Sequence, residues 1–107
     1  MKVKIVTFVP VDDADKVREA LGNAGAGQIG EYSFCSYSVL GKGRFIPSDN
    51  ANPHIGQSSV AEVVEEERIE VECDRSNAKA IIKAMKSAHP YEEVAFDIYP
   101  LIDEKEL

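Results

Sequence analysis

The spacing of hydrophobic residues changes several times along the chain, and each change marks a predicted element. Residues 2–9 are apolar on both faces and are followed by Pro10, a pattern typical of a central β-strand. Apolar residues then recur at helical spacing over residues 13–24, with aspartates in the first turn, where carboxylates favour the helix dipole. Asp12 or Asp13 is expected to cap this helix, and the glycines that follow are expected to end it.

The middle of the chain predicts strands and one long loop. A strand is expected over residues 31–40, and a further strand is expected to start near Arg44, after a turn at residues 41–43. Residues 46–59 contain two prolines, a glycine and small polar residues, which predicts a long loop. Residues 63–73 alternate between apolar and charged types, as in a strand with one buried face.

The last third of the sequence predicts a helix and a closing strand. Residues 77–88 place alanines, isoleucines and a methionine on one stripe with lysines opposite, and His89-Pro90 ends the helix. A final strand is expected over residues 94–101. The resulting order predicts an α+β fold, a ferredoxin-like βαββαβ sandwich whose antiparallel sheet carries two helices on one face. One domain would span residues 1–107, with residues 103–107 as a loose tail.

An uncovered sheet face in such a fold predicts self-association. Two helices cover one face only, and a sheet of this size usually buries its other face against another subunit or domain. We therefore expect a homo-oligomer.

The composition and the net charge limit the kinds of binding partner that we expect for this chain. The chain has 107 residues, 44% of them hydrophobic and 29% charged, as in ordinary globular domains. Its formal charge of −7 would repel phosphate backbones, so no nucleic-acid partner is expected. No apolar run suits a membrane span or a signal peptide, so we expect no membrane association and a cytoplasmic location, with Cys35 and Cys73 as reduced thiols.

Three blocks of sequence resemble a known family. They are AGAGQIGEYSFCS at residues 24–36, GRFIP with NPHIG at residues 43–47 and 52–56, and HPYEEVAFD at residues 89–97. Together they look like the domain inserted in YqfO-type proteins of the Nif-three-like dinuclear-metal family, a domain of the CutA and PII type. This resemblance implies a subunit that assembles as a trimer and has a regulatory or sensing role, occurring here as a stand-alone chain. The histidine-rich halves that carry the metal in the larger proteins are missing, so their dinuclear site is not carried over.

The segment from His89 to Glu93 is the strongest candidate site. It places an imidazole, a phenol and two carboxylates within five residues, just after a helix. His89, Glu92 and Glu93, with His54 from the long loop, could bind a divalent metal ion such as zinc, copper or manganese. Alternatively, His89 caps the helix, Tyr91 packs and the glutamates are solvated.

For other candidate residues, the sequence gives weaker indications of a functional site. Cys35 is expected in a strand, where a thiol packs as a small hydrophobe, although a base such as His89 or His54 beside it would allow nucleophilic catalysis. Tyr91, Arg44 and Cys35 are also candidates for ligand or interface contacts. Residues 65–67 form an acidic run that is expected to be solvated, or to meet Lys42 or Arg44 across an interface.

Three classes of function follow from these patterns. The first is a non-catalytic oligomeric module that binds or senses a small molecule or protein, because no complete nucleophile–base pair is visible. The second is a divalent-metal-binding protein that uses the segment from His89 to Glu93. An enzyme comes third.

Overall fold

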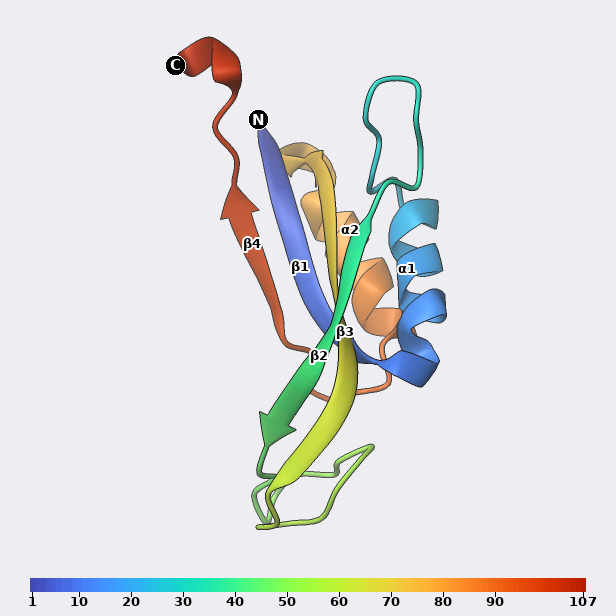
Figure 1. The fold of residues 1–107 in the computed structure, drawn as a ribbon, viewed down its shortest axis with the longest axis vertical. Helices are drawn as coiled ribbons and strands as arrows, with labels where there is room; N and C mark the ends of the chain where they lie inside the picture. Colours follow the sequence, from blue (N-terminus) through green and yellow to red (C-terminus); the bar gives the residue numbers. More distant parts are fainter.

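The computed structural model describes residues 1–107 and has the predicted element order (Figure 1). The strands are β1 (Lys2–Pro10), β2 (Tyr37–Phe45), β3 (Glu62–Asp74) and β4 (Phe96–Pro100), and the helices are α1 (Ala14–Asn23) and α2 (Arg75–Ala88). Short 3-10 turns lie at Val11–Asp13 and Glu104–Glu106. The sheet order is β2-β3-β1-β4 with every neighbouring pair antiparallel, so the predicted ferredoxin-like fold is confirmed.

The core lies between the sheet and the two helices, which pack on the same face (Figure 1). Cross-strand partners share a face of an antiparallel sheet, and the pairs Val3–Cys73 and Ile5–Val71 both point into this core. The buried apolar residues of α1 and α2 include Val17, Leu21, Ile81 and Met85. The helical spacing in the sequence therefore identified the buried stripes correctly.

The prediction for residues 31–45 was wrong in two respects. The strand begins at Tyr37, not near residue 31, and Phe34 in the segment before it has a left-handed backbone (φ 59°), which breaks the extended conformation. The glycines at 41 and 43 do not form a turn, since neither has a positive φ, and β2 continues through them to Phe45. One strand thus replaces the predicted strand, turn and strand.

Glycine ends α1 as the sequence predicted. The N–H of Ala26 donates to the carbonyl of Leu21 and that of Gly25 to Gly22, which is the Schellman pattern, and Gly25 has φ 105°. At the other end of α1, Asp13 occupies the N-cap position, but its side chain makes no capping hydrogen bond.

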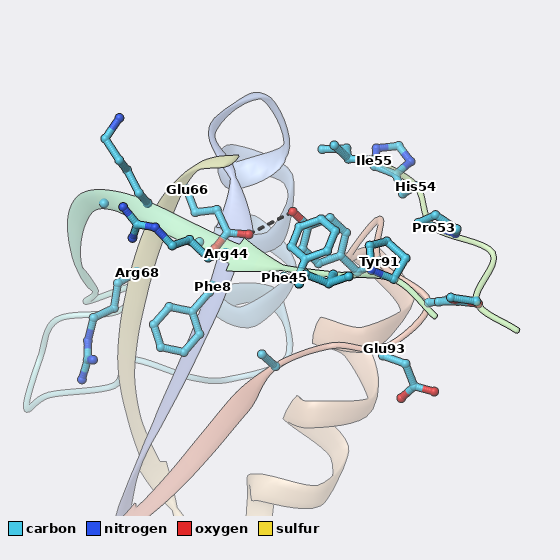
Figure 2. Close-up of a pocket in the computed structure, with 18 of the residues that line it drawn as sticks. Phe8, Arg44, Phe45, Pro53, His54, Ile55, Glu66, Arg68, Tyr91 and Glu93 are labelled. Atoms are coloured by element: carbon cyan, nitrogen blue, oxygen red, sulfur yellow. Dashed lines mark hydrogen bonds between the residues drawn. The ribbon is translucent and has the colours of Figure 1, made fainter. Parts of the chain in front are cut away.

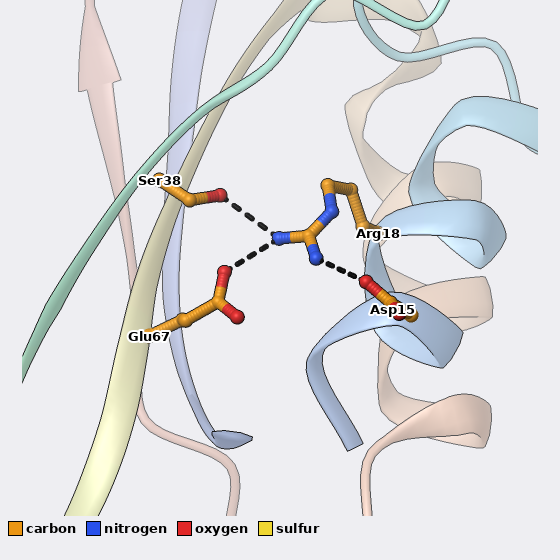
Figure 3. Close-up of polar contacts among 4 residues, drawn as sticks. All are labelled: Asp15, Arg18, Ser38 and Glu67. Carbon is orange, nitrogen blue, oxygen red and sulfur yellow. Dashed lines mark hydrogen bonds and ion pairs between the residues drawn. The ribbon is translucent and has the colours of Figure 1, made fainter. Parts of the chain in front are cut away.

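A partly buried cluster of hydrogen-bonded and charged side chains connects α1 to the sheet (Figure 3). One nitrogen of Arg18 donates to Glu67 at 2.7 Å and to Ser38 at 2.9 Å, and the other pairs with Asp15. The hydrogen bond to Glu67 raises the pKa of Arg18. Glu67 is therefore not solvated, unlike the expectation for the acidic run of residues 65–67. Lys42 forms an ion pair of 2.8 Å with Glu65 of the same chain, and not with a glutamate of another subunit.

The sheet face opposite the helices is uncovered by the rest of the chain. By register it carries Tyr37, Val39 and Tyr99, which are 68%, 46% and 40% exposed. Arg68 and Glu70 form an ion pair on the same face at 3.2 Å. This open face thus combines exposed apolar groups with internally paired charges.

No helix of the structure has the length and apolar character needed to cross a membrane. The C-terminal residues 101–107 lead away from the sheet beyond β4 (Figure 1).

Candidate functional site

Strands β2 and β3 extend past the end of β1 as a two-stranded ribbon, and the ribbon forms one wall of a cavity. β1 pairs with β3 only from Glu66 onward, whereas β2 pairs with β3 back to Glu62. The long loop of residues 46–61 leaves this ribbon at the same end of the molecule as the connection from α2 to β4 (Figure 1).

The cavity between these segments has a volume of about 780 Å³. The ribbon, the loop and the connection each contribute residues to its lining, which include Phe8, Lys42, Arg44, Phe45, Pro53, His54, Ile55, Glu66, Arg68, Tyr91, Glu92 and Glu93 (Figure 2). This volume lies in the range that binds small molecules.

A buried carboxylate lies in the lining of the cavity. Glu66 is 8% exposed, and its Oε2 accepts a hydrogen bond of 2.9 Å from the hydroxyl of Tyr91. The ring of Tyr91 packs edge-on against Phe45, with 6.0 Å between centroids, and lies 6.4 Å from the ring of His54. The ribbon, the loop and the α2–β4 connection therefore meet at one aromatic cluster.

A glycine makes room for this carboxylate. A Cβ atom at Gly43 would lie 1.9 Å from Oε1 of Glu66, so the side chain of Glu66 lies directly against the bare backbone of β2. Gly43, which in the sequence suggested a turn, thus lies within a strand and lets the side chain of Glu66 approach the backbone of β2 closely.

His89 has a structural position. It is 7% exposed, its Nδ1 accepts the backbone N–H of Tyr91 at 3.1 Å, and its Nε2 donates to the carbonyl oxygen of Phe8 at 2.7 Å. Both nitrogens are occupied, which assigns the tautomer with the proton on Nε2. The expectation that His89 caps helix carbonyls was wrong for the imidazole, because the ring connects α2 to β1 instead.

The other proposed metal ligands lie near His89 but are not arranged around a common point. Glu92 accepts the backbone N–H of Asn52 at 2.8 Å and so fixes the long loop, while Glu93 and His54 are exposed. No group of three or more His, Cys, Asp or Glu side chains is placed to hold a metal ion. A metal site formed by His89, Glu92, Glu93 and His54 stays a prediction from the sequence.

Cys35 is separated from both histidines. It lies in the loop between α1 and β2, at the end of the sheet opposite the long loop and the α2–β4 connection (Figure 1). Its predicted place in a strand was wrong, and the structure does not bring it to a base. Cys73 is 3% exposed in the core, as predicted, and burial raises the pKa of its thiol.

The lining of the cavity also includes the basic residues Lys42, Arg44 and Arg68, of which Arg44 and Arg68 are labelled in Figure 2. Lys42 pairs with Glu65 and Arg68 pairs with Glu70, whereas Arg44 forms no ion pair. The sequence did not single out Glu66, although one signal was present: side chains alternate along a strand, so Glu66 faces the side of the sheet opposite to Glu65 and Glu67.

Several solved structures share this fold. The CutA divalent cation tolerance protein of Archaeoglobus fulgidus superposes with a TM-score of 0.71 over 99% of this chain and 90% of that chain, at 16% identity. The chain therefore has the same ferredoxin-like fold as this CutA protein.

The sequence relatives are larger proteins. The chain is 52% identical over 98 residues to a GTP cyclohydrolase 1 type 2 homolog of Bacillus subtilis, a match that covers 92% of this chain and 26% of that protein. A Bacillus cereus protein related to NIF3 superposes with a TM-score of 0.83 at 49% identity, over 95% of this chain and 26% of that chain. No family model matches. The resemblance to the Nif-three-like proteins is confirmed, and the chain corresponds to about a quarter of their length.

The phenol of Tyr91 should ionise at a higher pH than a tyrosine in water. Burial, followed by the hydrogen bond to Glu66 and the charge of Glu66, raises its pKa well above the ordinary 10.0. The unfolded chain therefore loses this proton first, so this contribution to stability is complete below about pH 10 and falls at higher pH. We expect an ultraviolet titration to show one late phenol that is missing in Tyr91→Phe, and an unfolding free energy that falls less steeply above pH 10 in that variant. A late phenol that persists in Tyr91→Phe would contradict the assignment.

Proposed function

We propose that this chain is a non-catalytic binding or sensing module of the CutA and PII type, and that its ligand site is the cavity between the β2–β3 ribbon, the long loop and the α2–β4 connection. The observation that carries the proposal is a cavity of about 780 Å³ that holds a buried carboxylate, fixed by a phenol, with no nucleophile–base pair beside it. The chain matches only about a quarter of its relatives, so we propose ligand binding and not the chemistry in their name. The two free thiols support a cytoplasmic setting.

The test of this site is a binding screen read out residue by residue. Amide signals of the full chain should be followed by NMR while a set of small molecules is added. We expect the hits to shift signals of the ribbon, residues 46–61 and residues 89–95. Hits that shift only signals elsewhere would overturn the assignment of the cavity.

We further propose that copies of the chain associate through the open face, as a trimer. Tyr37 and Val39 expose apolar surface on this face, and a lone chain leaves them in water. Sedimentation equilibrium at micromolar concentration should give the mass of a trimer.

Two matched variants test the surface. Tyr37→Glu places a carboxylate beside Glu70 on the open face and should reduce the mass to that of one chain. Leu40→Glu is the control, because Leu40 is 67% exposed, almost the same as Tyr37, but lies on the other face of β2. Equal masses for the two variants would contradict association through this face.

A further inference from the structure

The carboxylate of Glu66 is only half satisfied within the chain. Its Oε2 accepts the hydroxyl of Tyr91, whereas Oε1 takes part in no hydrogen bond or ion pair. Every fully buried side-chain oxygen in this structure has a partner, so Oε1 is not fully enclosed, and Glu66 lines the cavity. Because Glu66 is only 8% exposed, a carboxylate oxygen without a donor is costly at this place, and a donor that enters the cavity would remove the cost.

No basic side chain of the chain pairs with this carboxylate. Arg68 is the one basic residue of β3 and lies on the same face as Glu66, but its guanidinium pairs at 3.2 Å with Glu70, which is further from Glu66 along the strand. Lys42 and Arg44 alternate with the glycines of β2 and therefore lie on the opposite face of that strand. The negative charge of Glu66 is thus left for a group from outside the chain.

Free space lies beside the carboxylate, over the backbone of β2. Gly41 is the cross-strand partner of Glu66, so a side chain at position 41 would lie on the same face as Glu66. A Cβ atom at Gly41 would meet nothing within 4 Å, whereas a Cβ atom at Gly43 would lie 1.9 Å from Oε1 of Glu66. The carboxylate therefore covers Gly43 and leaves the space over Gly41 empty, and both glycines line the cavity.

The carboxylate is held in place without a ligand. The hydroxyl of Tyr91 binds Oε2 at 2.9 Å, and the ring of Tyr91 packs edge-on against Phe45, with 6.0 Å between centroids (Figure 2). On the side of β2, the carboxylate lies against the bare backbone of Gly43. A binding group that is already fixed loses little conformational entropy when a ligand binds to it.

Apolar residues border the free space. Val39 lies two residues before Gly41 on the same face of β2, lines the cavity and is 46% exposed. Phe8 of β1 lines the same cavity and lies on the same face of the sheet, because both Phe8 and Val39 are cross-strand partners of Arg68. A ligand at this place therefore meets one anion and an apolar surface.

We propose that the cavity binds an organic cation, with its ammonium group donating to Oε1 of Glu66 and its apolar body in the space over Gly41, beside Val39. This inference rests on the proposed function, since it takes the cavity to be the ligand site. A charged donor is favoured over a neutral one, because hydrogen bonds between charged groups are roughly twice as strong as those between neutral groups. Glu66 thus selects the charge of the ligand, and Gly41 provides the room for its body.

Three probes separate charge from shape. 2-Phenylethylamine carries an ammonium group on an aromatic body, 2-phenylethanol has the same body with a neutral hydroxyl, and methylamine has the charge without the body. We expect 2-phenylethylamine at neutral pH to bind the full chain at least about tenfold more tightly than either of the others, which corresponds to about 1.4 kcal/mol. Calorimetry gives the dissociation constants, and NMR shifts give the location.

One pair of variants tests the contact with the carboxylate. Glu66→Gln should weaken 2-phenylethylamine to the level of 2-phenylethanol and leave the affinity for 2-phenylethanol unchanged. Glu65→Gln is the matched control, because it removes the same charge from the neighbouring residue, whose side chain lies on the other face of β3 and is 66% exposed. Equal losses of affinity in the two variants would show a general attraction by negative charge and would overturn the proposed contact.

A third variant tests the space over Gly41. Gly41→Leu fills this space and should weaken the amine and the alcohol alike. Gly41 has no positive φ, so leucine is compatible with its backbone. Unchanged affinity for both probes in folded Gly41→Leu would overturn the proposed position of the apolar body. Circular dichroism confirms that each variant is folded.

The outcomes distinguish this inference from the proposed function. If 2-phenylethanol binds in the cavity as tightly as 2-phenylethylamine, the organic cation is excluded while the cavity remains a ligand site. If Glu66→Gln changes the mass of the chain in sedimentation, the donor to Oε1 is a basic side chain of a second copy, and the inference is overturned. If no probe and no member of the wider screen shifts a cavity signal, both the inference and the proposed function are overturned.

Discussion

Replacement of His89 by alanine is expected to destabilise the fold by about 2–4 kcal/mol, because two partly buried backbone groups lose their partner and a buried side chain is removed. The carbonyl of Phe8 loses its donor and the N–H of Tyr91 loses its acceptor, around a residue that is 7% exposed. Urea unfolding measures the change in free energy. Because Tyr91 follows within two residues, the Tyr91–Glu66 hydrogen bond should weaken as well, and the late phenol should titrate earlier.

The control for this variant is His54→Ala. His54 is exposed and forms no hydrogen bond, so its removal should change the unfolding free energy by less than about 0.5 kcal/mol. The same pair of variants tests the metal prediction. If zinc raises the melting temperature of the native chain and not of folded His89→Ala, then His89 is a ligand and the hydrogen-bonded role assigned here is wrong.

Substitution of Gly27 by alanine should cost about 2–5 kcal/mol, the sum of a left-handed backbone and a steric clash. Gly27 has φ 84°, and its Cβ would lie 2.3 Å from the carbonyl oxygen of Cys35, which is backbone and cannot rotate away. Its N–H donates to Glu72 of β3 at 2.8 Å, and its carbonyl accepts from Cys35 at 3.0 Å. The clash would thus open the base of the loop between α1 and β2.

Gly30→Ala separates the two contributions. Gly30 lies in the same loop and has φ 58°, but a Cβ there meets nothing within 4 Å. It should cost only about 1–2 kcal/mol for the backbone. Equal losses in the two variants, measured by urea unfolding, would show that the contact with Cys35 does not constrain this loop.

The elements with a clear period could be predicted from the sequence. The stripe that contains Ile81 and Met85 identified α2, and the alternation of Ile69, Val71 and Cys73 identified β3, because burial of one face leaves a direct trace in the order of residues. Glycine was harder to interpret. Gly25 ends a helix, as predicted, but Gly41 and Gly43 continue a strand, since a missing side chain signals either a turn or a close approach and the sequence does not distinguish them.

The candidate site was predicted only in part. The segment from His89 to Tyr91 was correctly located at the end of a helix, and in the structure Tyr91 lines the cavity while His89 binds the backbone of β1. Arg44 was named as a ligand or interface candidate, whereas Glu66 was named only as part of the acidic run, because its burial depends on contacts that form on folding. The hydrogen bonds that occupy both nitrogens of His89 come from β1 and from the residue two positions ahead, and no spacing of ligand types reveals them.

The sequence by itself determined the order of strands and helices, the buried stripes and the presence of one uncovered sheet face, because each of these follows from the period of apolar residues along one element. Only the tertiary structure decided which of three adjacent glutamates is buried, which arginine lacks a partner and which histidine is enclosed. Those properties depend on contacts between β1, the β2–β3 ribbon and the α2–β4 connection, which are far apart in the chain and meet only when the antiparallel sheet forms.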